Sequence, residues 1–361
     1  MSCTQSELDL VTVNNISPFW TSYGFPVSGS RRMFISDNPE TINNAVLPST
    51  YATLWNDAVS GQTTVKYRVF LWHLNTTGST IKVGLTLGNG SSSDTYNIAN
   101  LKTAVAVTSN FLPQGQCAAA ALLGQTLDLD KPVSIANGKV GLIKEWSVPN
   151  GSLVGGVMEF DLSSSLSQAM VYKLRSVAGK GTADLTLHQG AVVPSVGVHP
   201  RGSWSFSDIQ GSSSSSTSQA PFAYAAGDSE RSVSISNGTN DNLMTASTSY
   251  QSADALNNPG HFGVIYYATF RFTNPTSSAK NIQIRLVARG AAYLGAIRAN
   301  NITNKIPRLT AQAGPPDKFP TQQGVSFATV NVPAGQTIDF PVKVAHAGGA
   351  NLPVALVVKT L

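Results

Sequence analysis

At 361 residues the chain is too long for most single hydrophobic cores and is well suited to two domains of ordinary size. Hydrophobic residues make up 42% of the sequence, enough for a core in each domain, but only 12% of residues are charged, about half the usual share. Uncharged polar residues and glycine must therefore supply much of the surface. This balance is typical of secreted, surface-exposed or self-assembling β-rich proteins and unusual for a cytosolic enzyme.

The charge pattern gives little support to nucleic-acid binding. The net charge of +5 comes from 24 basic and 19 acidic residues, and the basic residues are scattered, with Arg31 and Arg32 the only adjacent pair. No stripe of basic residues interleaved with aromatic residues occurs, so we expect no nucleic-acid partner. A mildly basic protein could still associate weakly with an anionic cell wall, which makes cell-wall glycan a candidate partner.

No stretch approaches the ~18 apolar residues of a membrane-spanning helix, and no signal segment is visible. We expect no membrane span, and we expect the sequence to begin at the mature end of an extracellular or cell-surface protein. Cys3 and Cys117 allow either one disulfide or two free thiols, and their spacing does not decide between these alternatives.

The segment "SPFWTSYGF" (residues 17–25) gathers aromatic side chains around a proline and a glycine, so it is expected to be a loop. Phe19, Trp20 and Tyr23 are candidate ligand or partner contacts, because exposed aromatic rings stack on sugars or dock proteins. The alternative, which we favour, is that these rings fasten the N-terminal segment onto the first domain.

The next segment, "SDNPETI" (residues 36–42), combines an Asp-Asn-Pro turn with two acidic residues. Its composition favours a capped turn, with Ser36 or Asp37 accepting backbone hydrogen bonds. The same side chains could instead contribute oxygen ligands to a Ca²⁺ site.

Two widely separated segments share one pattern. Residues 65–74 ("VKYRVFLWHL") and 81–87 ("IKVGLTL") alternate apolar and other side chains around the turn "NTTGST", which predicts a β-hairpin. The pattern returns at residues 265–286, and "VPNGSLVGG" and "VPAGQTIDF" extend the parallel downstream. We therefore predict equivalent hairpins at 69–87 and 270–286.

A hairpin alone cannot bury its apolar face, so each copy needs a second sheet. The predicted fold class is all-β, with two tandem antiparallel β-sandwich domains of immunoglobulin-like or jelly-roll-like type. One short helix is indicated by "QCAAAALLG" (116–124). The serine run in residues 208–221 predicts a linker or exposed loop, which divides the chain into domains at 1–207 and 222–361.

Motifs for chemistry are scarce. The five histidines are dispersed and the two cysteines are far apart, so we predict no bound metal and no cofactor. Glu159 and Asp161 share a strand face about 7 Å apart, but this spacing is common on surface strands and is interpreted as structural rather than catalytic. No nucleophile or phosphate-binding motif occurs, so we expect no catalytic residues and no enzymatic activity.

The segment "HPRGSWSF" (residues 199–206) precedes the serine run and supplies the last two candidate contacts, Arg201 and Trp204. Packing at the domain junction is the alternative and the favoured interpretation.

With "SDNPETI", "YRVFLWHLNTTGSTIKVGLTLGN", "HPRGSW", "YYATFRFTNPT", "RGAAYLGAI" and "NLPVALVV" in view, the chain resembles uncharacterised secreted or cell-surface β-rich proteins of Gram-positive bacteria. The resemblance implies an extracytoplasmic location and a β architecture, and it carries no catalytic residues with it.

Three function classes remain. The favoured one is a non-enzymatic extracellular structural or adhesive protein that self-assembles as a surface-layer, filament or matrix subunit. A glycan-binding or glycan-processing secreted protein is the second, and it would show a row of exposed aromatics or a carboxylate pair in a groove. The third is a double jelly-roll viral capsid protein, which would show parallel, upright barrels suited to pseudo-sixfold trimers.

Overall fold

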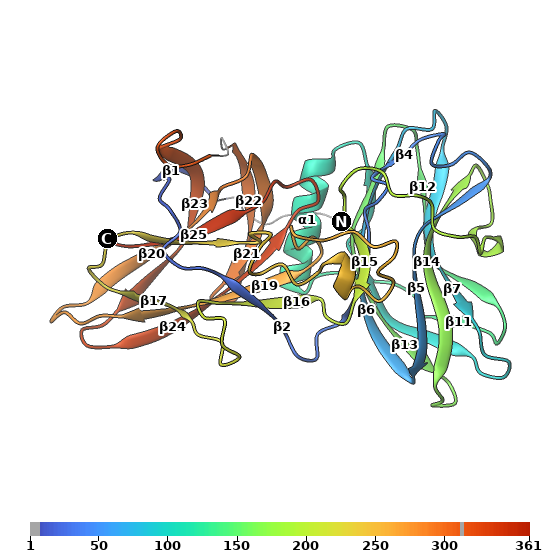
Figure 1. The fold of residues 1–361 in the computed structure, drawn as a ribbon, viewed down its shortest axis with the longest axis horizontal. Coiled ribbons are helices and arrows are strands. Elements are labelled where there is room, and N and C mark those ends of the chain that lie inside the picture. Colours follow the sequence, from blue (N-terminus) through green and yellow to red (C-terminus); the bar gives the residue numbers. More distant parts are fainter. Residues whose placement is uncertain (1–7, 311–313) are drawn as a thin grey trace.

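The computed structural model describes residues 8–310 and 314–361, and these are almost entirely β-strands. Two β-sandwiches lie side by side along the longest axis of the molecule, with the helix α1 (Phe111–Gly124) between them (Figure 1). The predicted all-β fold of two tandem sandwiches is confirmed. Among the described residues no helix is both long enough and apolar enough to cross a membrane.

The first sandwich consists of a four-stranded sheet in the order β12-β7-β14-β5 and a larger sheet that follows the path β10-β8-β13-β6-β3-β15. The strands of the smaller sheet are β5 (Tyr51–Gln62), β7 (Ile81–Asn89), β12 (Val140–Val148) and β14 (Met170–Lys180). Those of the larger sheet are β3 (Arg32–Ser36), β4 (Thr41–Ile42), β6 (Thr64–Asn75), β8 (Tyr96–Thr103), β9 (Ala106–Thr108), β10 (Asp128–Leu129), β11 (Val133–Ile135), β13 (Leu153–Ser164) and β15 (Arg201–Trp204).

The second sandwich pairs a sheet in the order β1-β23-β20-β25-β18 with a sheet in the order β2-β16-β19-β24-β21-β22. The first of these contains β1 (Leu10–Asn14), β18 (Arg231–Ile235), β20 (Lys280–Ala288), β23 (Thr321–Val332) and β25 (Val354–Thr360). The other contains β2 (Tyr23–Pro26), β16 (Asp208–Ser212), β17 (Phe222–Ala225), β19 (Ile265–Thr273), β21 (Ala292–Ala299), β22 (Ile302–Thr310) and β24 (Thr337–His346). Two 3-10 turns, η1 (Leu185–Leu187) and η2 (Ala246–Thr248), lie in the connections.

Both sandwiches have the same strand order. The eight main strands of the second are β18 to β25 in chain order, and those of the first are β5 to β8, then β10 and β11 sharing the fifth place, then β12 to β14. In each sandwich the first, eighth, third and sixth strands form one sheet, and the second, seventh, fourth and fifth form the other. Eight strands arranged in this way are two jelly rolls in one chain.

The predicted hairpins are wrong, although the two segments are equivalent. β6 pairs with β13 whereas β7 pairs with β12 and β14, so the turn after β6 crosses from one sheet to the other. β19 and β20 are separated in the same way. The pattern misled because alternation of apolar side chains describes each strand alone and does not identify its hydrogen-bonding partner.

The expected domain boundaries also differ from the observed ones. β1 pairs with β23 and β2 pairs with β16, so the N-terminal segment belongs to the second sandwich, outside the predicted 1–207 domain. The segment 208–221 is not an interdomain linker, because β16 begins it and both β16 and β17 pair with β19. Its serines form a loop that hydrogen-bonds to itself, with Ser212 Oγ accepting from the backbone of Ser214 and Ala220.

The two sandwiches are joined by a buried apolar contact. Phe70 and Trp72 on β6 belong to the same core cluster as the interior of the second sandwich, and the ring of Phe70 stacks on that of Phe262 at 6.1 Å. Gly348 faces Trp72 so closely that a Cβ would lie 2.5 Å from the indole. Arg68 adds ion pairs to Asp208 and to Glu159 across this junction.

The helix begins five residues before the predicted segment and packs against β13 of the first sandwich and β21 of the second. Its alanine-rich middle is buried on all sides, as expected for a helix enclosed between two layers. Cys117 in this helix is disulfide-bonded. The only other cysteine of the chain, Cys3, lies outside the described residues.

Candidate functional site

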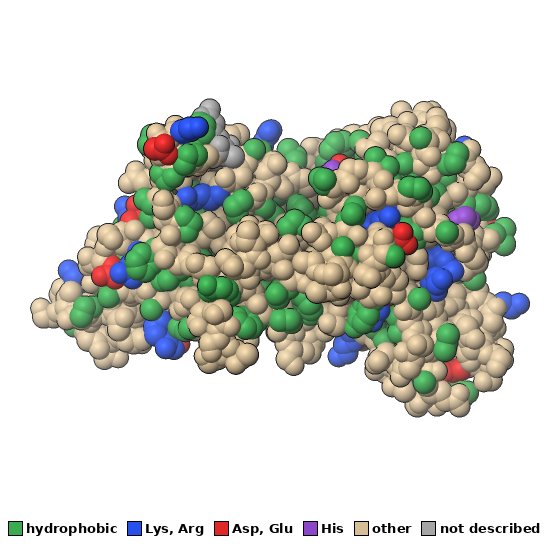
Figure 2. All heavy atoms as spheres, viewed as in Figure 1, with side chains coloured by type: hydrophobic (Ala, Val, Ile, Leu, Met, Phe, Trp, Pro, Cys, Tyr) green, Lys and Arg blue, Asp and Glu red, His purple; other side chains and the backbone are tan. Residues whose placement is uncertain are grey.

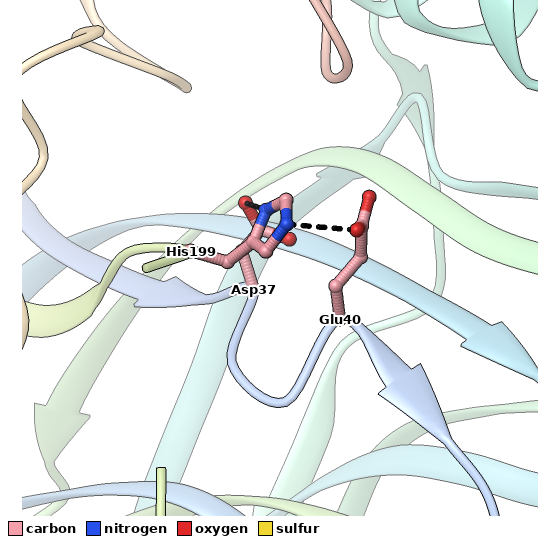
Figure 3. Close-up of side chains that lie close together, drawn as sticks. All are labelled: Asp37, Glu40 and His199. Carbon is pink, nitrogen blue, oxygen red and sulfur yellow. Dashed lines mark ion pairs between the residues drawn. The ribbon is translucent and has the colours of Figure 1, made fainter. Parts of the chain in front are cut away.

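The most chemically distinctive cluster lies at the end of β3 and joins two segments that the sequence singles out separately. Asp37 follows β3 directly, and Glu40 precedes β4. His199 stands two residues before β15, which pairs antiparallel with β3 and sets Arg201 opposite Ser36. This register carries His199 back over the turn, where it lies between the two carboxylates (Figure 3).

The imidazole of His199 faces one carboxylate with each nitrogen. Its Nε2 lies 2.9 Å from Glu40 Oε2, and its Nδ1 lies 3.7 Å from Asp37 Oδ2. Asp37 is 4% exposed, and its second oxygen, Oδ1, is buried without a hydrogen-bond partner among the described residues. The turn is fixed by Asn38, whose side chain donates to the carbonyl of Val196 at 2.8 Å and accepts from its N–H at 3.0 Å.

Burial and pairing act on the three groups in different directions. Hydrogen bonds to Asp37 and Glu40 raise the pKa of His199 to about 10. Burial raises the pKa of Asp37 to about 7 in spite of the neighbouring imidazolium. The hydrogen bond from His199 lowers the pKa of Glu40 below its usual value. At neutral pH the cluster is therefore an imidazolium between an ionised and a partly protonated carboxyl group.

The cluster offers three ligand atoms within 4.8 Å of one another, from Asp37, Glu40 and His199. Zinc accepts such a set of one imidazole and two carboxylates. However, the carboxylates contact opposite nitrogens of one ring, and a metal ion binds only one of these nitrogens. The observed arrangement is a double ion pair, which holds the segment before β15 against the turn after β3.

A buried serine–histidine pair lies behind this cluster. The carbonyl of Pro39 can only accept, so His73 donates from Nδ1 at 2.8 Å and its Nε2 accepts from the hydroxyl of Ser36 at 2.8 Å. Burial lowers the pKa of His73 to about 4, so the ring is neutral. Both residues are 0% exposed, and a pair without access to solvent holds the sheets together rather than attacking a substrate.

The second sandwich contains a similar buried network. Ser236 Oγ lies 2.9 Å from His261 Nδ1 and 2.8 Å from His346 Nε2, and the hydroxyl of Tyr293 lies 3.0 Å from His346 Nδ1. Burial lowers the pKa of His261 to about 4 and that of His346 to about 3. These rings are neutral packing groups, too.

The five candidate contact residues fall on different sandwiches. Trp20 packs edge-on against Phe222 and Phe270, so the N-terminal aromatic segment is fastened to the second sandwich rather than to the first. Phe19 is 59% exposed, and Tyr23 begins β2 at the edge of the same sandwich.

Arg201 and Trp204 are buried in β15 of the first sandwich. Arg201 donates to the carbonyls of Asp254 and Val193, and the indole of Trp204 donates to the carbonyl of Thr245. These contacts give both side chains a packing role. The cluster at His199 is the feature that the sequence did not reveal, because its members are more than 150 residues apart and meet only through the pairing of β3 with β15.

Comparison with known proteins leaves the chain without an assigned family. No family model matches it, and no curated protein matches it. Among solved structures, the tandem CBM22 domains of Paenibacillus barcinonensis Xyn10C align with 99% of this chain and 92% of theirs, at 9% identity and a TM-score of 0.18. The CUB1-EGF-CUB2 segment of human MASP-1/3 aligns with 87% of this chain and 100% of its own, at 6% identity and a TM-score of 0.17. Superpositions this poor carry no argument about function.

Proposed function

We propose that the protein is a non-enzymatic structural subunit that assembles with copies of itself into a shell or layer outside the cytoplasm. The observation that carries the proposal is the shared jelly-roll order of the two sandwiches. A chain with two copies of one fold presents two similar bodies, so it can fill two similar positions in a symmetric assembly. Jelly rolls are used in this way by viral capsid proteins, and they also occur in lectins and cupins.

The surface supports association. Figure 2 shows few charged side chains, scattered singly over a surface that is mostly uncharged. With 12% charged residues, copies of the chain repel one another less than ordinary soluble domains do. The connection before β15 also exposes two valines, Val196 at 56% and Val198 at 88%. Because Asn38 and His199 fix this connection, the valines form a preset apolar contact rather than a loose tail.

The orientation of the sandwiches restricts the kind of shell. In Figure 1, β5, β7 and β14 run up and down the view, whereas β17, β20 and β24 run mainly across it. The two barrels are therefore not parallel, which argues against upright double barrels in pseudo-sixfold trimers. A capsid or layer in which the two jelly rolls take different orientations is the form that we propose.

Glycan binding has weaker support. The exposed aromatic side chains of the described residues are Phe19 and Tyr250, which belong to different sandwiches. Arg231 covers one face of the Phe19 ring at 3.9 Å, and Arg32 covers one face of the Tyr250 ring at 3.6 Å. A sugar that stacks on either ring would have to use the other face or displace a guanidinium.

Electron microscopy combined with sedimentation velocity tests the proposal. We expect closed shells or ordered layers at high protein concentration, and we expect Val198→Asp to shift the protein toward the monomer because it places a charge in the contact. Ile302→Asp is the matched control, since Ile302 is 62% exposed on the second sandwich, away from this connection. A protein that remains monomeric at every concentration, with no assembly in the micrographs, would overturn the proposal.

A further inference from the structure

A trough of about 470 Å³ lies on the outer face of the sheet β12-β7-β14-β5. Its apolar surface comes from Val59 on β5, Val140 on β12 and Val171 on β14, the last of which is 54% exposed. Gly88 and Gly90 also line it, and their lack of side chains keeps it open. The volume is that of a site for a small organic molecule.

One end of the trough is formed by Arg175, a buried arginine without a counter-ion. Its neighbours along β14, Leu174 and Ser176, are fully buried, while Arg175 itself is 6% exposed and lines the trough. Its Nε and Nη1 atoms are buried and find no hydrogen-bond acceptor among the described residues. Burial lowers the pKa of Arg175, and no carboxylate opposes this effect.

The surroundings of Arg175 reinforce the need for an anion. Lys139 and Lys173 line the same trough, and no acidic residue does. The nearby His188 is also affected, because burial and the charge of Arg175 lower its pKa. Two more buried polar atoms, Thr86 Oγ1 and His188 Nε2, lack partners within the described chain, and Thr86 stands opposite Arg175 on the adjacent strand.

Leaving a buried charge unpaired is costly, and proteins normally supply a partner. We propose that the trough binds a small amphipathic anion whose carboxylate or phosphate pairs with Arg175 and whose apolar body lies on Val59, Val140 and Val171. A guanidinium matches the oxygens of either head group, and the lysines add attraction at longer range. This site is independent of the assembly proposed above.

Isothermal titration of the full-length protein with octanoate and octyl phosphate tests the inference, with octanol and octylamine as controls of equal chain length. We expect saturable binding of at least one anion and none of either control. Arg175→Met keeps the length of the side chain and removes the charge, so it should weaken anion binding about 10- to 100-fold, the range for a hydrogen bond to a charged group. Because it also removes a buried unpaired charge, this variant should fold.

Two further variants make the outcome decisive. Val171→Glu places an acid in the trough without altering Arg175 and should weaken anion binding as well. Arg271→Met, at the exposed ion pair with Asp339 on the second sandwich, should leave it unchanged. If neither anion binds, if octanol binds as well as octanoate, or if Arg175→Met binds with undiminished affinity, the proposal is wrong. Binding of only one of the two anions identifies the head group.

Discussion

Asn75 and Asn274 make the same four hydrogen bonds at the same corner of the two sandwiches. Each side-chain N–H₂ donates to the carbonyl of the serine four residues on, at 2.7 and 2.9 Å, and to the carbonyl of Val148 or Val332, at 2.8 Å in both. Each side-chain oxygen accepts from the backbone and the hydroxyl of the threonine two residues on. Each asparagine thereby ties the turn after one strand to the end of a strand in the opposite sheet.

The first prediction concerns these asparagines. Asn274 is 1% exposed, so Asn274→Ala leaves buried carbonyl and N–H groups without partners, and each such group costs about 1–3 kcal/mol. We expect a fall in the free energy of unfolding of a few kcal/mol, and Asn75→Ala should have an effect of similar size. Urea denaturation followed by circular dichroism measures it.

The control for this prediction is Asn331→Ala. Asn331 makes an exposed side-chain hydrogen bond to Asn281, and its loss should change the free energy of unfolding by no more than about 0.5 kcal/mol. Equal effects of the buried and exposed substitutions would show that the corner hydrogen bonds do not stabilise the fold.

The asparagine corner also shows how far the sequence could be interpreted. "NTTGS" and "NPTSS" are visible as related turns, and the alternation around them predicts the strands, so the fold class and the duplication follow from local patterns. The sheet to which each strand belongs is decided by contacts between distant residues. For that reason the hairpins were wrong, and β1 and β2 were assigned to the first domain although they pair with β23 and β16.

The candidate sites were harder to predict for the same reason. The meeting of His199 with Asp37 and Glu40 depends on the pairing of β15 with β3, for which the sequence has no local signal. The missing counter-ion of Arg175 is equally invisible, since an arginine on the outer face of a strand is usually solvated.

The second prediction is a pH dependence of stability from His199. Its folded-state pKa is raised from 6.5 to about 10, so its contribution is fully present below pH 6.5 and is lost as the pH rises through 10. His199→Gln should therefore be less stable than the wild type at pH 6, with a difference that shrinks toward pH 10. Thermal unfolding of both proteins across this range measures the difference.

Asp37 supplies an internal check on this prediction. Its pKa is raised from 3.8 to about 7, so the folded state holds the proton more tightly and stability falls as the pH rises from 4 to 7. Asp37→Asn cannot ionise and should lack this part of the pH dependence. If the wild type and both variants had parallel stability profiles, the three groups would not be coupled as described.

The third prediction is that the protein holds no stoichiometric zinc after dialysis. Both ring nitrogens of His199 already face carboxylates, and a zinc ion would have to break one of these ion pairs. We expect elemental analysis to give a metal content well below one ion per chain, and we expect chelator to leave the melting temperature unchanged. One zinc ion per chain, lost in His199→Gln, would contradict this expectation.

The last prediction concerns the N-terminal strand. β1 covers the edge of β23, and Val13, which is 1% exposed, packs with Val287, Ala355 and Val357. Deletion of residues 1–15 should therefore expose the edge of β23 and lower the free energy of unfolding. If the assembly forms by exchange of β1 between copies, the deletion should also reduce the assembled fraction in sedimentation velocity. Val13→Ala separates the two effects, because it weakens the packing but keeps the backbone pairing with Gln322. An assembled fraction unchanged by the deletion, in a protein that still folds, would show that copies associate through other surfaces, of which the connection carrying Val196 and Val198 is the first to test.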